Sequence, residues 1–180
     1  MKQTVLITGA SSGFGEACAK LYAERGYKVV MGARNLAKLL SLQAQMPEPQ
    51  KISCAPLDVR FPDAINHFFD ALPEGFREID ILINNAGLAL GVEPAHAADL
   101  DDWETMIDTN IKGLVRVTRK VLPQMVERNT GHIVNMGSMA ASWPYPGSNA
   151  YGGTKAFVQQ FSRGLRADVL GKNIRVSNIE

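Results

Sequence analysis

The sequence predicts an α/β fold in which a parallel sheet is covered by helices on both faces. Short runs rich in β-branched residues alternate with longer amphipathic segments along the whole chain, as in consecutive βαβ units. The short runs are apolar at successive positions, which is typical of strands buried on both faces. A composition of 46% hydrophobic and 21% charged residues in a chain of 180 is that of an ordinary globular protein. We therefore expect one domain over residues 1–180, with no internal boundary.

The alternation assigns strands and helices in order along the chain. Strands are expected at residues 4–7, 28–31, 51–55, 79–83, 132–136 and 174–178. Helices are expected at residues 13–25, 36–45, 62–72, 100–128 and 151–170. Gly26 is a suitable stop for the first helix, and Asp99 or Asp101 can cap the fourth. The last strand reaches the final residue, Glu180, and because an unprotected edge strand is a liability, we expect a truncated chain or a disordered tail.

Charge and composition limit the class of partner. Nineteen basic and eighteen acidic side chains leave a net charge of +1 without a basic stripe, which gives no support for binding nucleic acid or an anionic membrane. The apolar run before Gly9 is too short for a signal peptide, and Cys18 and Cys54 are expected to be buried small residues rather than a disulfide framework. The three histidines lie far apart, so no metal site is expected. We expect a cytoplasmic protein that binds a small molecule.

A glycine-rich turn follows the first strand and opens the first helix. It reads Thr8-Gly9-Ala10-Ser11-Ser12-Gly13-Phe14-Gly15. Glycines at such a place let the backbone turn sharply and approach a phosphate at the helix N-terminus. The spacing differs from G-x-G-x-x-G, and the Lys-Ser/Thr pair of an ATP-binding loop is missing. The turn therefore predicts a dinucleotide site, with an ordinary tight turn as the alternative.

The ends of the second and third strands indicate which dinucleotide binds. The second strand runs into Arg34, where an NAD-binding domain usually has an acidic residue for the ribose hydroxyls. Because a guanidinium can pair with a 2′-phosphate through two N–H groups, NADP is favoured over NAD, unless Arg34 merely caps a surface loop. Asp58, which precedes Val59, can accept a hydrogen bond from the adenine amino group or cap the next turn.

The fourth strand ends in Asn84-Asn85-Ala86-Gly87. Small residues there permit close approach of a cofactor, and asparagine side chains can tie neighbouring strands together. For Asn84 we expect a mainly structural role.

Polar residues around the fifth strand point to proton transfer. Tyr151 and Lys155 are four residues apart, so they share one helix face. A tyrosine phenol has a pKa of about 10 and is a poor base at neutral pH, but an adjacent ammonium stabilises its phenolate. Ser138 can donate a hydrogen bond to a substrate oxygen, and Asn110 can hold a water that relays the proton. A Tyr-x-x-x-Lys pair alone also arises by chance on solvated helices, so the combination carries the interpretation.

These motifs together resemble the short-chain dehydrogenase/reductase family, and the resemblance spans the whole chain. It implies a Rossmann-type doubly wound sheet and an NAD(P)-dependent oxidoreductase. In this family Tyr151 would be the acid/base, Ser138 would orient the carbonyl or alcohol, and Lys155 would bind the nicotinamide ribose while lowering the pKa of Tyr151. Asn110 matches the proton-relay position. The residues expected to bind the cofactor are Gly9, Ser11, Ser12, Gly13, Phe14, Gly15, Arg34, Asp58, Val59, Asn85, Ala86, Gly87, Tyr151 and Lys155.

Within the family, segments 85–91, 93–96, 102–110 and 142–145 resemble the bacterial NADP-dependent 3-hydroxy acid dehydrogenases, which oxidise serine or allo-threonine and reduce malonic semialdehyde. Two departures bear on this. The family continues past the sixth strand with a Pro-Gly turn and a substrate lobe, so the group that binds the substrate carboxylate is expected beyond Glu180. Many NADP-specific relatives also have a basic residue where this chain has Ser12 or Asn35, so the NADP prediction rests on Arg34 alone.

Two other classes of function stay open. One is a reductase of another small carbonyl compound. The other is a nucleotide-binding module without turnover, either a redox sensor or a fragment. A sensor would not need Tyr151 and Lys155, whereas a fragment would keep them by inheritance.

Apolar residues recur every four positions on the two longest helices. They are Phe157, Phe161, Leu165 and Val169 on the last, and Trp103, Ile107, Ile111 and Val115 on the fourth. Such faces are core or subunit interface. Their likeness to the paired-helix contact of the family predicts a homodimer or homotetramer through the fourth and fifth helices.

Overall fold

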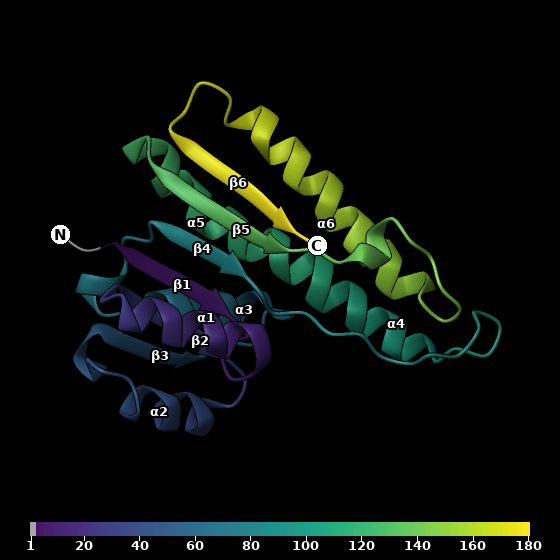
Figure 1. Ribbon diagram of the computed structural model, residues 1–180, viewed down its shortest axis with the longest axis horizontal. Helices are drawn as coiled ribbons and strands as arrows, with labels where there is room; N and C mark the ends of the chain where they lie inside the picture. Colours follow the sequence, from purple (N-terminus) through teal and green to yellow (C-terminus); the bar gives the residue numbers. More distant parts are fainter. Residues whose placement is uncertain (1–2) are drawn as a thin grey trace.

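A computed structural model describes residues 3–180 as one six-stranded parallel sheet flanked by helices (Figure 1). The strand order is β3-β2-β1-β4-β5-β6. This order reverses between β1 and β4, as in doubly wound dinucleotide-binding folds. The predicted α/β fold is therefore confirmed. The strands are β1 Thr4–Thr8, β2 Lys28–Ala33, β3 Ile52–Pro56, β4 Ile81–Asn84, β5 Gly131–Met136 and β6 Ile174–Ile179.

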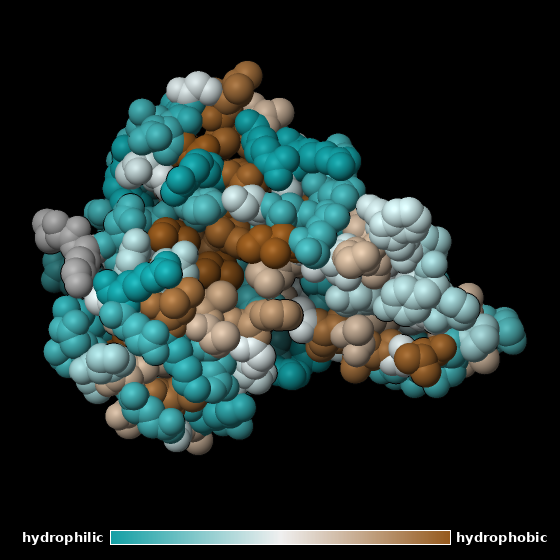
Figure 2. Space-filling model, in the orientation of Figure 1, coloured by the Kyte–Doolittle hydropathy of each residue, from teal (hydrophilic) through white to brown (hydrophobic). Residues whose placement is uncertain are grey.

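Helices pack on both faces of the sheet and divide the core into two apolar clusters. Side chains of α1 and α2, such as Ala19 and Leu39, pack on one face. Side chains of α3, α5 and α6, such as Phe68, Val121 and Leu165, pack on the other. On the face opposite α5 and α6, no helix among residues 3–180 covers β5 and β6, and Figure 2 shows apolar residues gathered there. The helices are α1 Gly13–Glu24, α2 Leu36–Ala44, α3 Pro62–Asp70, α4 Leu100–Ile107, α5 Leu114–Arg128 and α6 Asn149–Asp168.

The expected fourth helix is not one regular helix, which corrects the prediction for residues 100–128. A π-helical turn, Asp108–Gly113, separates α4 from α5. The turn buries Thr109 and Asn110, and Asn110 is held there by hydrogen bonds to neighbouring segments. The apolar repeat continues through the turn, so the pattern gave no sign of it.

Other boundaries differ by a few residues. The third strand begins at Ile52, later than expected, because residues 49–51 form a 3₁₀ turn before it. The fourth strand also begins later than expected, at Ile81. The last helix begins at Asn149, earlier than expected. Both predicted helix ends are confirmed: Gly26 has φ +75° after α1, and the Asp99 side chain accepts from the Asp101 N–H at 2.8 Å before α4.

A chain of buried amides links the strands to the helices behind them. Asn84 Nδ2 donates to Thr118 Oγ1 and to Asn135 Oδ1, both at 2.9 Å. Asn135 Nδ2 donates in turn to Ser162 Oγ at 2.9 Å. These bonds join β4, β5, α5 and α6, so the structural role expected of Asn84 is confirmed.

The two cysteines are free but only half-buried, so the expectation that both are buried was wrong. Burial raises the pKa of the Cys54 thiol to about 11, which keeps it in the unreactive thiol form at neutral pH. Within residues 3–180, no helix has the length and apolar content to cross a membrane.

Candidate active site

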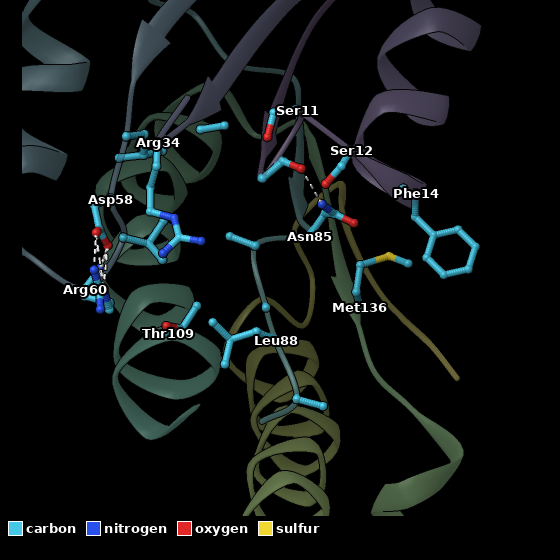
Figure 3. A pocket seen from close by; sticks show the side chains of 18 of the residues that line it. Ser11, Ser12, Phe14, Arg34, Asp58, Arg60, Asn85, Leu88, Thr109 and Met136 are labelled. Carbon is cyan, nitrogen blue, oxygen red and sulfur yellow. Dashed lines mark hydrogen bonds and ion pairs between the residues drawn. The ribbon is translucent and has the colours of Figure 1, made fainter. Parts of the chain in front are cut away.

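An elongated cleft of about 530 Å³ lies at the carboxyl ends of the strands. Arg34, Asp58 and Arg60 line one side, and Phe14 and Met136 line the other (Figure 3). Ser11, Ser12 and Asn85 lie between them (Figure 3). The cleft lies where the strand order reverses, which is the place where open α/β sheets bind ligands.

The glycine turn between β1 and α1 packs tightly against the loop after β4. Gly9 and Gly13 have φ values of +66° and +54°, which favour glycine. A Cβ on Gly9 would lie 2.9 Å from the Cα of Ala86, and one on Gly15 would lie 2.4 Å from the carbonyl oxygen of Gly9. Gly15 therefore lets α1 pack against the turn, and it is not among the residues that line the cleft.

The amino end of α1 opens towards this cleft and suits a phosphate. A Cβ on Gly13 would meet no described atom within 4 Å, so space is open beside it. The Ser12 side chain makes no capping hydrogen bond. Unpaired N–H groups and the helix dipole at such an end attract anions. The turn thus fits the pyrophosphate of a dinucleotide.

Thr8 and Asn85 hold the two loops together. Thr8 Oγ1 accepts from the N–H groups of Asn85 and Ala86, at 3.1 and 3.0 Å. Asn85 Nδ2 donates to the carbonyl oxygens of Thr8 and Gly9, at 3.0 and 3.1 Å. The floor of the cleft is therefore fixed by bonds between β1 and β4.

A cluster of charge occupies the end of the cleft at β2 and β3. The Arg60 guanidinium forms a salt bridge with the Asp58 carboxylate, with three N···O distances of 2.7 to 3.2 Å. The hydrogen bonds from Arg60 lower the pKa of Asp58, and the charge of Arg34 adds a smaller effect. Asp58 Oδ1 also accepts from the Arg60 N–H at 3.1 Å, which is the capping alternative expected for it. Asn35 caps α2 by accepting from the Lys38 N–H at 3.0 Å.

Lys155 and Tyr151 lie at the β5 side of the cleft on α6. The side chain of Lys155 is only 7% exposed. Its Nζ donates to the Met136 carbonyl oxygen at 2.7 Å and lies 5.7 Å from the centre of the Tyr151 ring. Burial lowers the pKa of Lys155 to about 8. The helix thus brings an ammonium and a phenol to the same part of the cleft.

Ser138 follows β5, two residues after Met136, although it is not among the residues that line the cleft. It caps a 3₁₀ turn, Met139–Ala141, by accepting from the Ala140 N–H at 3.2 Å. A Cβ on Gly152 would lie 2.8 Å from the Ala140 carbonyl oxygen, so this turn packs directly on the first turn of α6. Ser138 is therefore held next to the helix that carries Tyr151.

Asn110 is buried behind the cleft and joins three segments. Its Nδ2 donates to the Leu88 carbonyl at 2.8 Å and to Thr154 Oγ1 at 3.0 Å, and its Oδ1 accepts from the Leu88 N–H at 2.9 Å. A Cβ on Gly87 would lie 3.2 Å from Asn110 Oδ1 and 3.6 Å from Lys155 Nζ. Gly87 thus keeps open the narrow space between these two polar groups.

The cleft contains most of the residues that sequence reasoning selected. Gly15, Ser138 and Asn110 lie outside its lining, as described above. The prediction missed several neighbours of the selected residues, of which Arg60 carries a charge. The missed lining residues are Ala33, Asn35, Leu57, Arg60, Leu88, Ala89, Thr109, Met136 and Gly137. Each of them lies within two residues of a selected residue in the sequence, which was the available signal. Among residues 3–180, no group of three or more His, Cys, Asp or Glu side chains is placed to hold a metal ion.

Comparison with known proteins agrees with this geometry. The model of the short chain dehydrogenase family matches residues 3–180. The chain is 55% identical over 176 residues to the NADP-dependent 3-hydroxy acid dehydrogenase YdfG of Salmonella typhi, a match that covers 98% of this chain and 70% of that protein. It is 49% identical over 180 residues to sulfoacetaldehyde reductase 2 of Chromohalobacter salexigens, covering 99% of this chain and 71% of that protein.

A solved structure described as the closed form of serine dehydrogenase complexed with NADP+ is also similar. It superposes with a TM-score of 0.96 at 53% identity, and the match covers 99% of this chain and 71% of that one.

Proposed function

This chain belongs to the short-chain dehydrogenase family, and from that premise we propose that it is an NADP-dependent oxidoreductase acting on small 3-hydroxy acids. Its substrates would be serine, allo-threonine, or the pair 3-hydroxypropionate and malonic semialdehyde. The observation that carries the proposal is one cleft with Arg34 at one side and the buried Lys155, beside Tyr151, at the other. The 55% identity to a 3-hydroxy acid dehydrogenase and the likeness to an NADP+ complex of serine dehydrogenase support it.

The residues of the cleft would hold the cofactor along its length. Arg34 would pair with the 2′-phosphate, Asp58 would accept from the adenine amino group beside Val59, and the α1 end at Ser11–Phe14 would bind the pyrophosphate. Asn85, Ala86 and Gly87 would form the floor. When bound, NADP(H) would supply or accept the hydride at its nicotinamide ring.

The residues beside Met136 would handle the proton. Tyr151 would give its proton to the carbonyl oxygen as a hydroxyl forms, and take it back in the reverse direction. Lys155 Nζ would hold the ribose and stabilise the phenolate, while Ser138 would donate to the same substrate oxygen. Asn110 would position a water that returns the proton from solvent.

Turnover by this chain tests the proposal. We expect NADPH consumption with malonic semialdehyde, and NADP reduction with serine or allo-threonine. The panel also includes sulfoacetaldehyde, because its sulfonate lies at the same distance from the aldehyde as the malonic semialdehyde carboxylate. Turnover with sulfoacetaldehyde alone would refute the 3-hydroxy acid assignment and favour another small carbonyl. Saturable NADPH binding with no turnover on any of them would favour a binding fragment.

Exchange of Arg34 for aspartate tests the cofactor assignment. We expect Arg34→Asp to shift preference from NADP towards NAD, because a carboxylate repels a 2′-phosphate and can bind the free ribose hydroxyls. The measurement is the ratio of kcat/KM with the two cofactors. An unchanged ratio would show that Arg34 does not read the 2′-phosphate.

We also propose that the chain forms a homodimer or homotetramer through α4, α5 and α6. Leu165 and Val169 of the apolar repeat predicted on the last helix belong to the core, whereas Phe157 and Ile107 are 38% and 39% exposed. Phe157 stacks on Phe161 with ring centres 5.7 Å apart. An apolar strip of this kind fits an interface better than solvent.

Phe157→Asp should lower the mass of the particle in solution, measured by light scattering, because it puts a charge in the proposed interface. Leu40→Asp on α2 is the matched control, since Leu40 is 47% exposed and α2 packs at the β3 edge of the sheet, opposite to the β6 edge where α6 packs. Equal masses for both variants and the unmodified chain would exclude this interface.

We also propose a cytoplasmic location, as the sequence predicts. The free thiols of Cys18 and Cys54 support it, because cysteines stay reduced in the cytoplasm.

A further inference from the structure

Arg60 brings a second guanidinium to the adenine side of the cleft, where the sequence had suggested Arg34 alone. It follows Asp58 by two residues in the loop after β3 and lines the same wall as Arg34 (Figure 3). Its side chain does not point free into the cleft. Nε lies 3.0 and 3.2 Å from the two Asp58 oxygens, and Nη2 lies 2.7 Å from Oδ2. This two-pronged geometry gives strong and well-oriented ion pairs.

Other contacts fix Arg60 in this place. Its carbonyl oxygen accepts a hydrogen bond from Nη1 of Arg116 on α5. Its guanidinium lies 5.3 Å from the centre of the Phe61 ring. The side chains of Asp58 and Arg60 are 21% and 29% exposed, so the pair is partly shielded from water. A shielded pair keeps more of its attraction than one in open solvent.

Further charges act on each member of this pair. Arg34, directly after β2, acts on Asp58, and Asp108 acts on Arg60 from the π-helical turn. Asp108 is itself paired with Lys112 at 2.7 Å. Without Arg60, the Asp58 carboxylate would therefore face the cleft with only Arg34 to balance it.

The ion pair between Arg60 and Asp58 reconciles two roles that the proposed function gives to this side of the cleft, binding adenine and binding a 2′-phosphate. Asp58 is suited to accept from the adenine amino group, which NADP and NAD share. The 2′-phosphate of NADP carries a further negative charge of its own, and an unmasked carboxylate on the same wall would repel it. Neutralising the carboxylate removes this repulsion and leaves its oxygens in place as acceptors for adenine.

We infer that Arg60 determines cofactor specificity by neutralising the charge of Asp58. The Asp58 carboxylate can then accept a hydrogen bond from adenine without repelling the 2′-phosphate of NADP. The inference rests on the proposed NADP dependence. Arg60 is a positioning residue here, since it acts through Asp58 and not by touching the phosphate.

A double-mutant cycle on cofactor binding tests this. The dissociation constants of NADPH and NADH are measured by their fluorescence for the unmodified chain, Arg60→Gln, Asp58→Asn and the double variant. We expect Arg60→Gln to weaken NADPH about tenfold while changing NADH much less. In the double variant the ratio of the two constants should return close to its original value, because no carboxylate is left to mask.

Two further variants serve as controls for this experiment. Arg25→Gln removes the same charge at the far end of α1 and should leave the ratio unchanged. Arg60→Lys keeps the charge without the two-pronged geometry, and should keep most of the preference even if Arg60→Gln folds poorly.

Three results would overturn the inference. They are an unchanged ratio in Arg60→Gln, an equal change in Arg25→Gln, and a loss that persists in the double variant, which would mean that Arg60 contacts the phosphate directly. Failure of the proposed function would look different, because the unmodified chain would then show no preference for NADPH.

Discussion

Tyr151→Phe should lower kcat by about 10²- to 10⁴-fold, which is the usual contribution of a general acid or base. Phenylalanine keeps the ring that lies 5.7 Å from Lys155 Nζ and removes only the hydroxyl that would carry the proton. The dissociation constant for NADPH should change little, because the phenol oxygen is assigned to the substrate. The measurement is single-turnover kinetics beside a fluorescence titration.

Tyr145→Phe is the matched control for this variant. Tyr145 is 52% exposed in the loop after β5 and lies outside the cleft lining, so loss of its hydroxyl should leave kcat nearly unchanged. If Tyr151→Phe turns over at the rate of the unmodified chain, Tyr151 is not the acid/base.

Lys155→Met should lower kcat by about 10²-fold or more, because it removes the preorganised charge beside Tyr151.

The same variant should change the pH dependence of the free energy of unfolding. Burial lowers the pKa of Lys155 from 10.5 to about 8 in the folded chain. Between these values the unfolded chain binds more protons than the folded one, so the free energy of unfolding should rise with pH through this window.

The size of that rise follows from the shift in pKa. A fall from 10.5 to about 8 corresponds to about 3 kcal/mol, gained between about pH 8 and pH 10.5. Denaturant unfolding at both ends of the window measures it. Cys54 and Tyr22, whose pKa values are raised by burial, titrate in both proteins, so the difference between the unmodified chain and Lys155→Met isolates Lys155. Parallel pH profiles for the two proteins would refute the burial of a charged lysine.

The strand ends were predictable because a parallel sheet gathers them along one edge. Arg34, Asp58 and Asn85 each follow a different strand, so assigning the strands also brought these residues to one cleft. Local signals such as Gly26 and Asp99 also held, because a positive φ and a side-chain cap depend only on near neighbours.

Features that depend on distant partners were not predictable in this way. The π-helical turn accompanies bonds from Asn110 to Leu88 and Thr154, which are 22 and 44 residues away in sequence. The cysteines are exposed in part because helix packing leaves their positions at the edge of a cluster. From the sequence alone, Arg60 is indistinguishable from a solvent-exposed arginine. Its role becomes visible only through the geometry of its bonds to Asp58.

The reversal of strand order between β1 and β4 has a consequence for how such a protein can evolve. It assigns the loops of β2 and β3 to one half of the cleft and those of β4 and β5 to the other. Substitutions at positions of the two halves that are far apart and share no contact should have energetic effects that add independently. A lineage could therefore exchange one nucleotide for another, or one carbonyl compound for another, without redesigning the opposite half.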